Sequence, residues 1–298
     1  MNLNVDPIAP HRNRLLGLAY RMLGSRADAE DVLQDAWLRF RGAADVTNVE
    51  AFLVTTVTRL CLDWLKSARA HREVYIGTWL PEPVLDGEAL SPHATTELAD
   101  DLSFALMLLI DRLSPAERAA FLLHDIFDLN YAEVAQVLGK SEPASRQLAA
   151  RARKAVRNAK FHRRPPDEVY HRLFRAFGEA IQNGDVARLA AHFHEDAVYL
   201  SDAGGKRLTA LRPVVGADRI ARLLVGGMRK FGAPQGEIRT EIRPVNGTPG
   251  ILVFIDGLLS QITSIAVEDE KILAFYVQLN PEKLRRIEAE ATRAAGPH

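Results

Sequence analysis

The sequence predicts two structural classes in one chain: an all-α N-terminal half and an α+β C-terminal domain. Three observations support this division. Helix start signals recur between residues 11 and 164, the pair Pro165-Pro166 ends that pattern, and runs of alternating apolar and polar residues follow it. A length of 298 residues is enough for two separate cores.

The first part of the chain is expected to form a compact bundle of three helices, which we assign to residues 1–76. An apolar stripe that begins at Leu15 stops at Gly24, and a second helix restarts at Ser25 and runs through Phe40. The stretch Thr47–Glu50 is a capping box that opens a long helix ending near residue 71. Short joints between helices favour a bundle.

Residues 77–96 are predicted to be an acidic linker. Between Pro81 and Asp101 the chain has three prolines, six carboxylates and no Lys or Arg. Such a segment suits a positively charged channel of a partner or the basic DNA-binding faces of the chain itself, and the plain alternative is a soluble connector. Trp79 and Leu80 weigh against that alternative, because an indole usually has somewhere to bury.

Residues 97–164 are predicted to form a helix-turn-helix domain. Ser114–Glu117 and Asn130–Glu133 are capping boxes, and Gly139 suits the left-handed position after a helix. From Arg146 to Arg164 there are eight Lys or Arg and no Asp or Glu, and phosphate is the natural counter-charge of such a helix. A solvated basic helix end is the alternative. The predicted DNA contacts are Ser145, Arg146, Gln147, Arg151, Arg153 and Lys154.

Residues 165–298 are expected to form the α+β domain. The predicted helices are 167–183 and 185–192, and the predicted strands are 197–200, 237–245, 250–255, 258–267 and 271–277. An enzyme is one alternative for this domain, with His192, His194, Asp196, Tyr199 and Asp256 as candidate acid/base groups. The two histidines lack a third ligand at a recognisable spacing, so we expect no metal, no cofactor and no catalytic residue.

The composition also limits the location. The single cysteine, Cys61, excludes an internal disulfide and reads as a small core residue. There is no signal-peptide pattern and no apolar run long enough to span a bilayer, so a cytoplasmic location without membrane contact is expected.

Two motifs of the helical half resemble those of bacterial sigma factors. Asp28–Arg39 is similar to conserved region two, and Leu113–Arg118 before the helix-turn-helix is similar to region four. The compact form resembles the extracytoplasmic-function group. The resemblance implies binding to core RNA polymerase through Asp31, Gln34, Asp35, Leu38 and Arg39. It also implies reading of the promoter −10 element by the following helix, where Arg59, Lys66, Arg69 and Arg72 make one face positive and Asp63 interrupts it. The helix-turn-helix would read the −35 element.

The C-terminal domain resembles the cone-shaped SnoaL-like fold shared with nuclear transport factor two. Three elements are similar to motifs of a sigma subgroup with this domain fused: Trp79-Leu80-Pro81-Glu82-Pro83 in the linker, the loop Asp202–Lys206, and Asn280-Pro281-Glu282-Lys283-Leu284. Ala203 departs from the loop pattern, whereas Gly204, Gly205 and Lys206 keep it. The resemblance implies that these elements regulate the sigma factor. We expect Trp79 to dock near this loop.

Two alternatives remain at this level. The C-terminal cavity could bind a small ligand, which would make the protein a one-component DNA-binding regulator, or it could perform cyclase- or isomerase-like chemistry. The sigma-like bundle before the linker discriminates against a simple regulator, since such a protein has no use for a polymerase-binding surface.

Overall fold

The computed structural model describes residues 9–72, 75–85, 90, 101–157, 164–231 and 236–295. The chain divides into two compact units. The first combines Met1–Val74, Asp86–Leu102 and Leu106–Ala159, and the second combines Tyr75–Leu85, Ser103–Ala105 and Lys160–His298. The first residues of the predicted linker therefore belong to the second unit.

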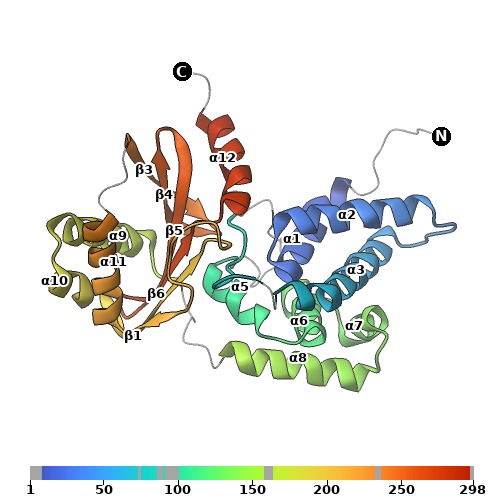
Figure 1. The fold of residues 1–298 in the computed structure, drawn as a ribbon. Helices are drawn as coiled ribbons and strands as arrows, with labels where there is room; N and C mark the ends of the chain where they lie inside the picture. Colours follow the sequence, from blue (N-terminus) through green and yellow to red (C-terminus); the bar gives the residue numbers. More distant parts are fainter. Residues whose placement is uncertain are drawn as a thin grey trace. The chain divides into compact units, whose positions relative to one another are not determined.

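The N-terminal bundle lies in the first unit (Figure 1). Its elements are η1 Ala9–His11, α1 Arg12–Leu23, α2 Arg26–Arg41 and α3 Val49–Arg72. Gly24 ends α1 with a φ of 72°, and the Ser25 hydroxyl caps α2 by accepting the amide hydrogen of Asp28 at 3.2 Å. Helix α1 packs against both α2 and α3, and buried Leu18 and Val57 belong to this core.

The helix-turn-helix lies in the same unit, except for residues 104 and 105 at its start, which group with the second unit. Its elements are α5 Phe104–Asp111, α6 Pro115–Phe121, the π-helical turn η3 Leu122–Ile126, α7 Tyr131–Leu138 and α8 Glu142–Arg157. Ser114 with Glu117 and Asn130 with Glu133 form the predicted capping boxes, and Gly139 takes a φ of 63° after α7. The helix predicted to start at residue 97 is described from Phe104, because residues 91–100 lie outside the described residues.

The second unit is a mixed sheet with helices, as expected. Its elements are α9 Asp167–Asn183, α10 Val186–Ala191, β1 Phe193–Asp202, β2 Val214–Val215, α11 Ala217–Phe231, β3 Ile238–Val245, β4 Thr248–Ile255, β5 Leu258–Glu268, β6 Lys271–Gln278 and α12 Pro281–Ala295. All five predicted strands are present. Strand β2 and helices α11 and α12 were not predicted.

The strands follow the order β2-β1-β6-β5-β4-β3. Strands β1 and β6 are parallel, and the other neighbours are antiparallel. Figure 1 shows α9, α10 and α11 on one side of this sheet and α12 on the other. We call these the helix side and the tail side.

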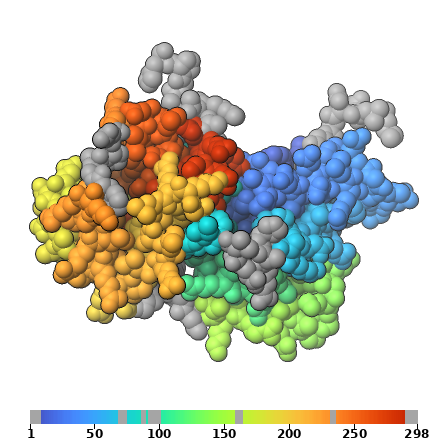
Figure 2. Space-filling model, viewed as in Figure 1, coloured from blue at the N-terminus to red at the C-terminus, as the bar shows by residue number. Residues whose placement is uncertain are grey.

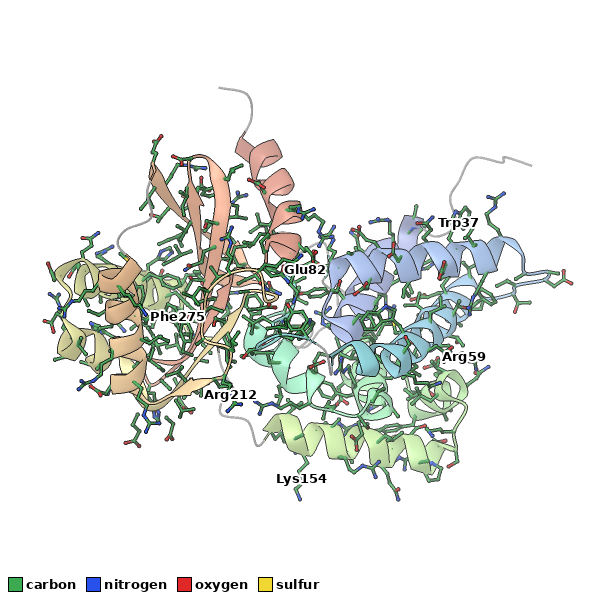
Figure 3. The ribbon with its side chains drawn as sticks, in the orientation of Figure 1. Trp37, Arg59, Glu82, Lys154, Arg212 and Phe275 are labelled. Atoms are coloured by element: carbon green, nitrogen blue, oxygen red, sulfur yellow. The ribbon has the colours of Figure 1, made fainter. Side chains whose placement is uncertain are left out.

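Aromatic side chains fill the helix side of the sheet. The ring of Phe275 on β6 lies 5.0 Å from that of Phe177 and 6.0 Å from those of Phe193 and Tyr199, measured between centroids. Figure 3 shows Phe275 pointing from the sheet toward the helices. On the tail side, Leu284 and Ile287 of α12 are buried, and α12 packs on β5. The core therefore has a layer on each face of the sheet.

Candidate functional site

Helix α2 presents one continuous exposed face. Helical periodicity places Asp31, Gln34, Asp35, Leu38 and Arg39 on it, and all five side chains are exposed. Leu38 is 57% exposed, which is unusual for a leucine in a small bundle. Trp37 and Phe40 instead lie half-buried and stack on each other at 6.3 Å. The predicted partner surface and the aromatic packing thus occupy different faces of one helix, and Figure 2 shows the bundle that contains this helix in blue.

Helix α3 carries the predicted −10 residues. Arg59, Asp63 and Lys66 are exposed, and Asp63 forms an ion pair with Lys66 at 2.8 Å. The side chains of Arg69 and Arg72 lie outside the described residues, although the backbone there is helical.

Arg59 contacts the helix-turn-helix rather than water alone. Its Nε donates a hydrogen bond to the carbonyl of Val137 at 3.2 Å, and Nη2 donates to the carbonyl of Gln136 at 3.4 Å. These carbonyls end α7, where the helix dipole favours a positive charge. Arg59 is labelled in Figure 3, at the side of α3 that faces α7.

Two further arginines join the bundle to the helix-turn-helix within the first unit. Arg14 donates to the Phe127 carbonyl at 2.7 Å and pairs with Glu50 at 2.6 Å. Arg118, only 3% exposed, donates to the Met22 carbonyl at 2.5 Å. Beside Arg14 and Arg59 the surface opens into a groove of about 980 Å³, lined by the α2–α3 joint and the start and end of α7.

Helix α8 presents a polar outer face along the green surface at the lower edge of Figure 2. Arg146, Gln147, Arg151 and Lys154 are all exposed on it. Arg146 pairs with Glu142 at 2.6 Å, and its guanidinium lies 5.0 Å from the ring centroid of Tyr131. Lys154 points away from the helical core in Figure 3. This face has the charge and exposure that contact with DNA requires.

Two of the residues predicted to contact the −35 element, Ser145 and Arg153, do not lie on the exposed face of α8. Ser145 is fully buried, so its side chain does not reach a DNA groove, and that prediction is wrong. The reason is helical phase: Ser145 lies on the same side of α8 as the core residues Leu148 and Ala149. Arg153 binds inward, pairing with Asp125 at 2.6 Å and donating to the Tyr131 hydroxyl.

Arg153 therefore holds α8 against the residues that precede and begin α7. Burial raises the pKa of the Asp125 carboxyl above its ordinary value, and the adjacent Arg153 opposes that rise. Glu117 shows the opposite case, since its hydrogen bonds from Ser114 and Arg151 lower the pKa of its carboxyl.

The predicted regulatory elements meet in the second unit around Asp202. The Asp202 carboxylate is fully buried and accepts four hydrogen bonds: from the Tyr75 hydroxyl at 2.5 Å, the Leu80 amide at 2.9 Å, the Gly204 amide at 3.1 Å and the Lys283 ammonium at 2.7 Å. Lys283 also donates to the Leu80 carbonyl at 2.5 Å. We call these residues, with Trp79 and Asn280, the Asp202 clasp.

Aromatic rings and an amide complete the clasp. The ammonium of Lys283 lies 4.6 Å from the ring centroid of Trp79 and 5.5 Å from that of Tyr75, so two rings and a carboxylate surround it. Asn280 donates to the Tyr75 hydroxyl at 3.0 Å. Burial and Asp202 together raise the pKa of the Tyr75 hydroxyl, which keeps it a donor. Trp79 thus lies against Lys283, whose ammonium binds Asp202 at the start of the loop.

The chain beyond Leu80 continues against the second unit. Leu80 to Val84 are buried, including Pro81 and Glu82. Glu82 pairs with Arg286 of α12 at 2.8 Å. Val84 donates its amide to the Asn246 side chain at 3.0 Å and accepts the Asn246 amide at 2.8 Å. This part of the linker is a built-in layer of the domain rather than a free connector.

The loop after Asp202 accommodates Ala203, the one residue that departs from the pattern of the similar sigma subgroup. The left-handed φ values fall on Gly204 and Gly205, at 58° and 72°, and not on Ala203. A Cβ on Gly204 would lie 2.6 Å from the Asn280 side chain. Lys206 pairs with Glu282, next to the clasp and exposed to solvent. Glycine is therefore needed at 204, while alanine fits at 203.

Of the candidate acid/base groups, Tyr199 lies in the aromatic core, and Asp196 and Asp256 lie at the surface. Asp196 and Asp256 are exposed, and Asp256 accepts the Glu237 amide at 2.9 Å in a turn. His194 Nδ1 accepts the amide hydrogen of Asp196 at 3.2 Å. Tyr199 alone is buried among rings. His192 is half-buried at the end of α10.

Metal binding and membrane crossing were also considered as roles for residues in the described ranges of the chain, and neither has a matching feature there. Within those ranges, no three His, Cys, Asp or Glu side chains are grouped in a way that could hold a metal ion. No helix of the same ranges is long and apolar enough to cross a bilayer.

Comparisons with known proteins agree with this geometry. The Sigma-70 region 2 model matches residues 8–71, and the Sigma-70, region 4 model matches residues 103–156. The ECF RNA polymerase sigma factor SigJ of Mycobacterium tuberculosis is 40% identical over 291 residues, covering 94% of this chain and 93% of that protein. The probable ECF sigma factor SigI of the same species is 32% identical, covering 96% of this chain and 97% of that protein.

A solved structure supports the same relation. The crystal structure of M. tuberculosis SigJ aligns with a TM-score of 0.69 and 38% identity, covering 92% of this chain and 95% of that chain. The two matched regions make this a protein of the sigma-70 class. More narrowly, the chain belongs to the family of extracytoplasmic-function RNA polymerase sigma factors, which direct transcription initiation.

Proposed function

We propose that three helices of this sigma factor bind polymerase and promoter DNA. We also propose that the Asp202 clasp regulates its transcription activity. The exposed face of α2 binds core RNA polymerase, α3 holds the −10 element, and the outer face of α8 reads the −35 element. The observation that carries this assignment is the exposure of Leu38 and its neighbours on one helix and of Gln147 and Lys154 on another. The faces of α2 and α8 are exposed in the folded chain, as a contact surface must be.

The −35 assignment predicts different roles for Gln147 and Lys154. A residue that contacts a base edge affects specificity, whereas one that contacts phosphate affects affinity for all sequences. We therefore expect Gln147→Ala to relax preference at one promoter position, and Lys154→Ala to weaken binding evenly and lower the salt slope by about one. Arg222→Ala on exposed α11 is the matched control. Unchanged promoter binding by both test variants would reject the assignment of α8.

The contact between α3 and α7 supports a closed state of the promoter-binding half. While Nε and Nη2 of Arg59 donate to the α7 carbonyls, those two groups do not contact DNA phosphate. In this proposal promoter binding exchanges the two hydrogen bonds for phosphate contacts, and release of Arg14 from the Phe127 carbonyl accompanies the exchange. Because these contacts join α3 and the bundle to the helix-turn-helix, their loss would let the two DNA-binding regions separate during initiation.

The clasp limits that separation. A fully extended chain covers about 3.3–3.6 Å per residue, so residues 73–103 could span roughly 100 Å, whereas residues 86–103 alone could span roughly 60 Å. Holding Tyr75–Leu85 on the second unit therefore shortens the available linker. We expect release of the clasp to raise transcription from promoters with the longest spacing between elements. The test is Trp79→Ala in transcription with core polymerase, since this change removes a ring over Lys283 and leaves the DNA-reading faces intact.

A non-catalytic role for the C-terminal domain agrees with the packing of its core. Tyr199 is stacked on Phe275, and its hydroxyl bonds with Thr209 and Ser201. The exposed carboxylates Asp196 and Asp256 lie on the surface rather than beside it. A small molecule bound beside Phe275 would compete with the ring contacts of Phe177, Phe193 and Tyr199. A rise in the domain's melting temperature on adding a steroid-like or polyketide-like compound would favour ligand sensing. The alternative is that the domain acts only by holding the linker residues Tyr75–Leu85.

A further inference from the structure

Strand β3 forms an outer edge of the sheet in the second unit. It is the last strand in the sheet order, and within the described ranges only β4 pairs with it (Figure 1). An edge strand offers unpaired backbone groups to another strand. The register of β3 on β4 shows which groups these are.

The inward and outward groups of β3 alternate. The Asp256 amide donates to the Glu237 carbonyl at 3.0 Å, so residue 237 directs its backbone toward β4. Because antiparallel pairing alternates, residues 239, 241 and 243 do the same, and the N–H and C=O groups of 238, 240 and 242 point to the open edge. Pro244, which has no N–H, occupies the next outward position and ends the series.

Two isoleucines on this edge are exposed. Ile238 is 44% and Ile242 is 45% exposed, and both lie on the helix side of the sheet with Ile251 and Ile255 of β4 as their register partners. On the tail side the exposed part of the same strand is charged, with Arg239, Glu241 and Arg243, and buried Val245 ends the strand on that face. Apolar and charged side chains are therefore sorted onto opposite faces of the edge.

The sequence of β3 is complementary to itself when reversed. Centring an antiparallel pair on Thr240 places Ile238 opposite Ile242, Arg239 opposite Glu241, and Glu237 opposite Arg243. Moving the centre to residue 239 places Glu237 opposite Glu241, and moving it to residue 241 places Arg239 opposite Arg243. Charges and a proline commonly protect an edge strand from pairing with another strand. In the register centred on Thr240, however, each charged side chain of the strand lies opposite a side chain of opposite charge.

We propose that β3 is a homodimer interface, in which the edges of two copies pair antiparallel about Thr240. The two sheets then form one continuous sheet across a two-fold axis, as an isologous interface requires. Thr240 pairs with its equivalent, Ile238 pairs with the second copy's residue 242, and each such pair exchanges two backbone hydrogen bonds. An edge contact of this kind is small, below about 1,200 Å² of total buried area, so the dimer is reversible.

Glu237 and Arg243 give the sharpest test. They stand six positions apart on one strand, roughly 20 Å, so they cannot pair within one copy. Glu237→Arg places two positive charges opposite each other in a homodimer, and Arg243→Glu places two negative charges opposite each other. A mixed dimer of the two variants restores Arg opposite Glu at both positions.

The measurement is sedimentation velocity of the full-length protein over a dilution series. We expect reversible dimers of the wild type, a dimer dissociation constant raised at least about tenfold in each variant (~1.4 kcal/mol), and recovery in the equimolar mixture. Arg219→Glu on exposed α11 is the control and should associate as the wild type does. Melting temperatures at the lowest concentration verify that the variants fold.

Two results would overturn the proposal. One is a wild-type protein that stays monomeric at every concentration, and the other is a dimer that neither variant weakens. Failure of recovery in the mixture would reject the register. These outcomes are independent of promoter binding, so they do not decide the proposed sigma function.

Discussion

Replacing Asp202 by asparagine should open the Asp202 clasp while leaving the sheet in place. The change keeps the size of the side chain but removes the charge that faces Lys283, whose side chain is only 14% exposed. It also turns an acceptor into an amide whose NH2 group can face the Leu80 N–H. The Lys283 ammonium keeps the Leu80 carbonyl and the rings of Trp79 and Tyr75 among its contacts.

The magnitude follows from burial. Removing one partner of a buried ion pair costs about 3–5 kcal/mol, and a hydrogen bond to a charged group contributes about 1.5–3 kcal/mol. Since Lys283 keeps other contacts, we expect about 2–4 kcal/mol for opening of the clasp. Hydrogen exchange at the Leu80 amide measures this directly, and its protection should fall by about thirty- to several-hundred-fold.

Glu282→Gln provides a matched control, because it is also a carboxylate-to-amide change in the same region. The Lys206–Glu282 pair is 46% and 60% exposed, and pairs of this kind contribute less than about 1 kcal/mol. Exchange at Leu80 should therefore change little in that variant. Equal, small effects of the two substitutions would refute the reasoning that burial makes the Asp202 contact strong.

Three other predictions concern the first unit. Leu38→Asp should abolish co-purification with core polymerase without lowering the melting temperature, since the side chain is 57% exposed; a lost fold would contradict this. Arg59→Ala should both increase amide hydrogen exchange at the last turn of α7 and weaken promoter binding, because the same guanidinium makes both contacts. Unchanged hydrogen exchange with weaker promoter binding would contradict this shared role. Hydrogen bonds from Ser114 and Arg151 lower the pKa of Glu117 below its ordinary value, so its stabilisation is present at neutral pH and is lost as pH falls through that lowered pKa. Glu117→Gln should remove this acid-side loss in thermal melts, and an identical pH profile would be inconsistent with it.

Local signals explain most of what the sequence predicted correctly. The capping boxes at Ser114 and Asn130 and the left-handed Gly139 depend on neighbouring residues only, and each is present. The alternating pattern located β3 to within one residue of its observed start. These features need no knowledge of the tertiary fold.

The missed features had other causes. Helix α12 carried an overlooked start signal, since Asn280 caps the amide of Glu282 and Pro281 takes the first position. Ser145 was misplaced because a basic run does not define the helical phase of its uncharged members. The four hydrogen bonds to Asp202 come from segments more than a hundred positions apart in some cases, so no local pattern predicts them. The resemblance pointed to these elements, and the structure supplies their contacts.

Transcription with purified core RNA polymerase tests the central claim most directly. The full-length protein should produce promoter-specific transcripts that the Leu38→Asp and Lys154→Ala variants reduce, the first through polymerase binding and the second through DNA affinity. Duplex DNA binding without any transcript from the wild-type protein would contradict the account and favour a ligand-sensing DNA-binding regulator.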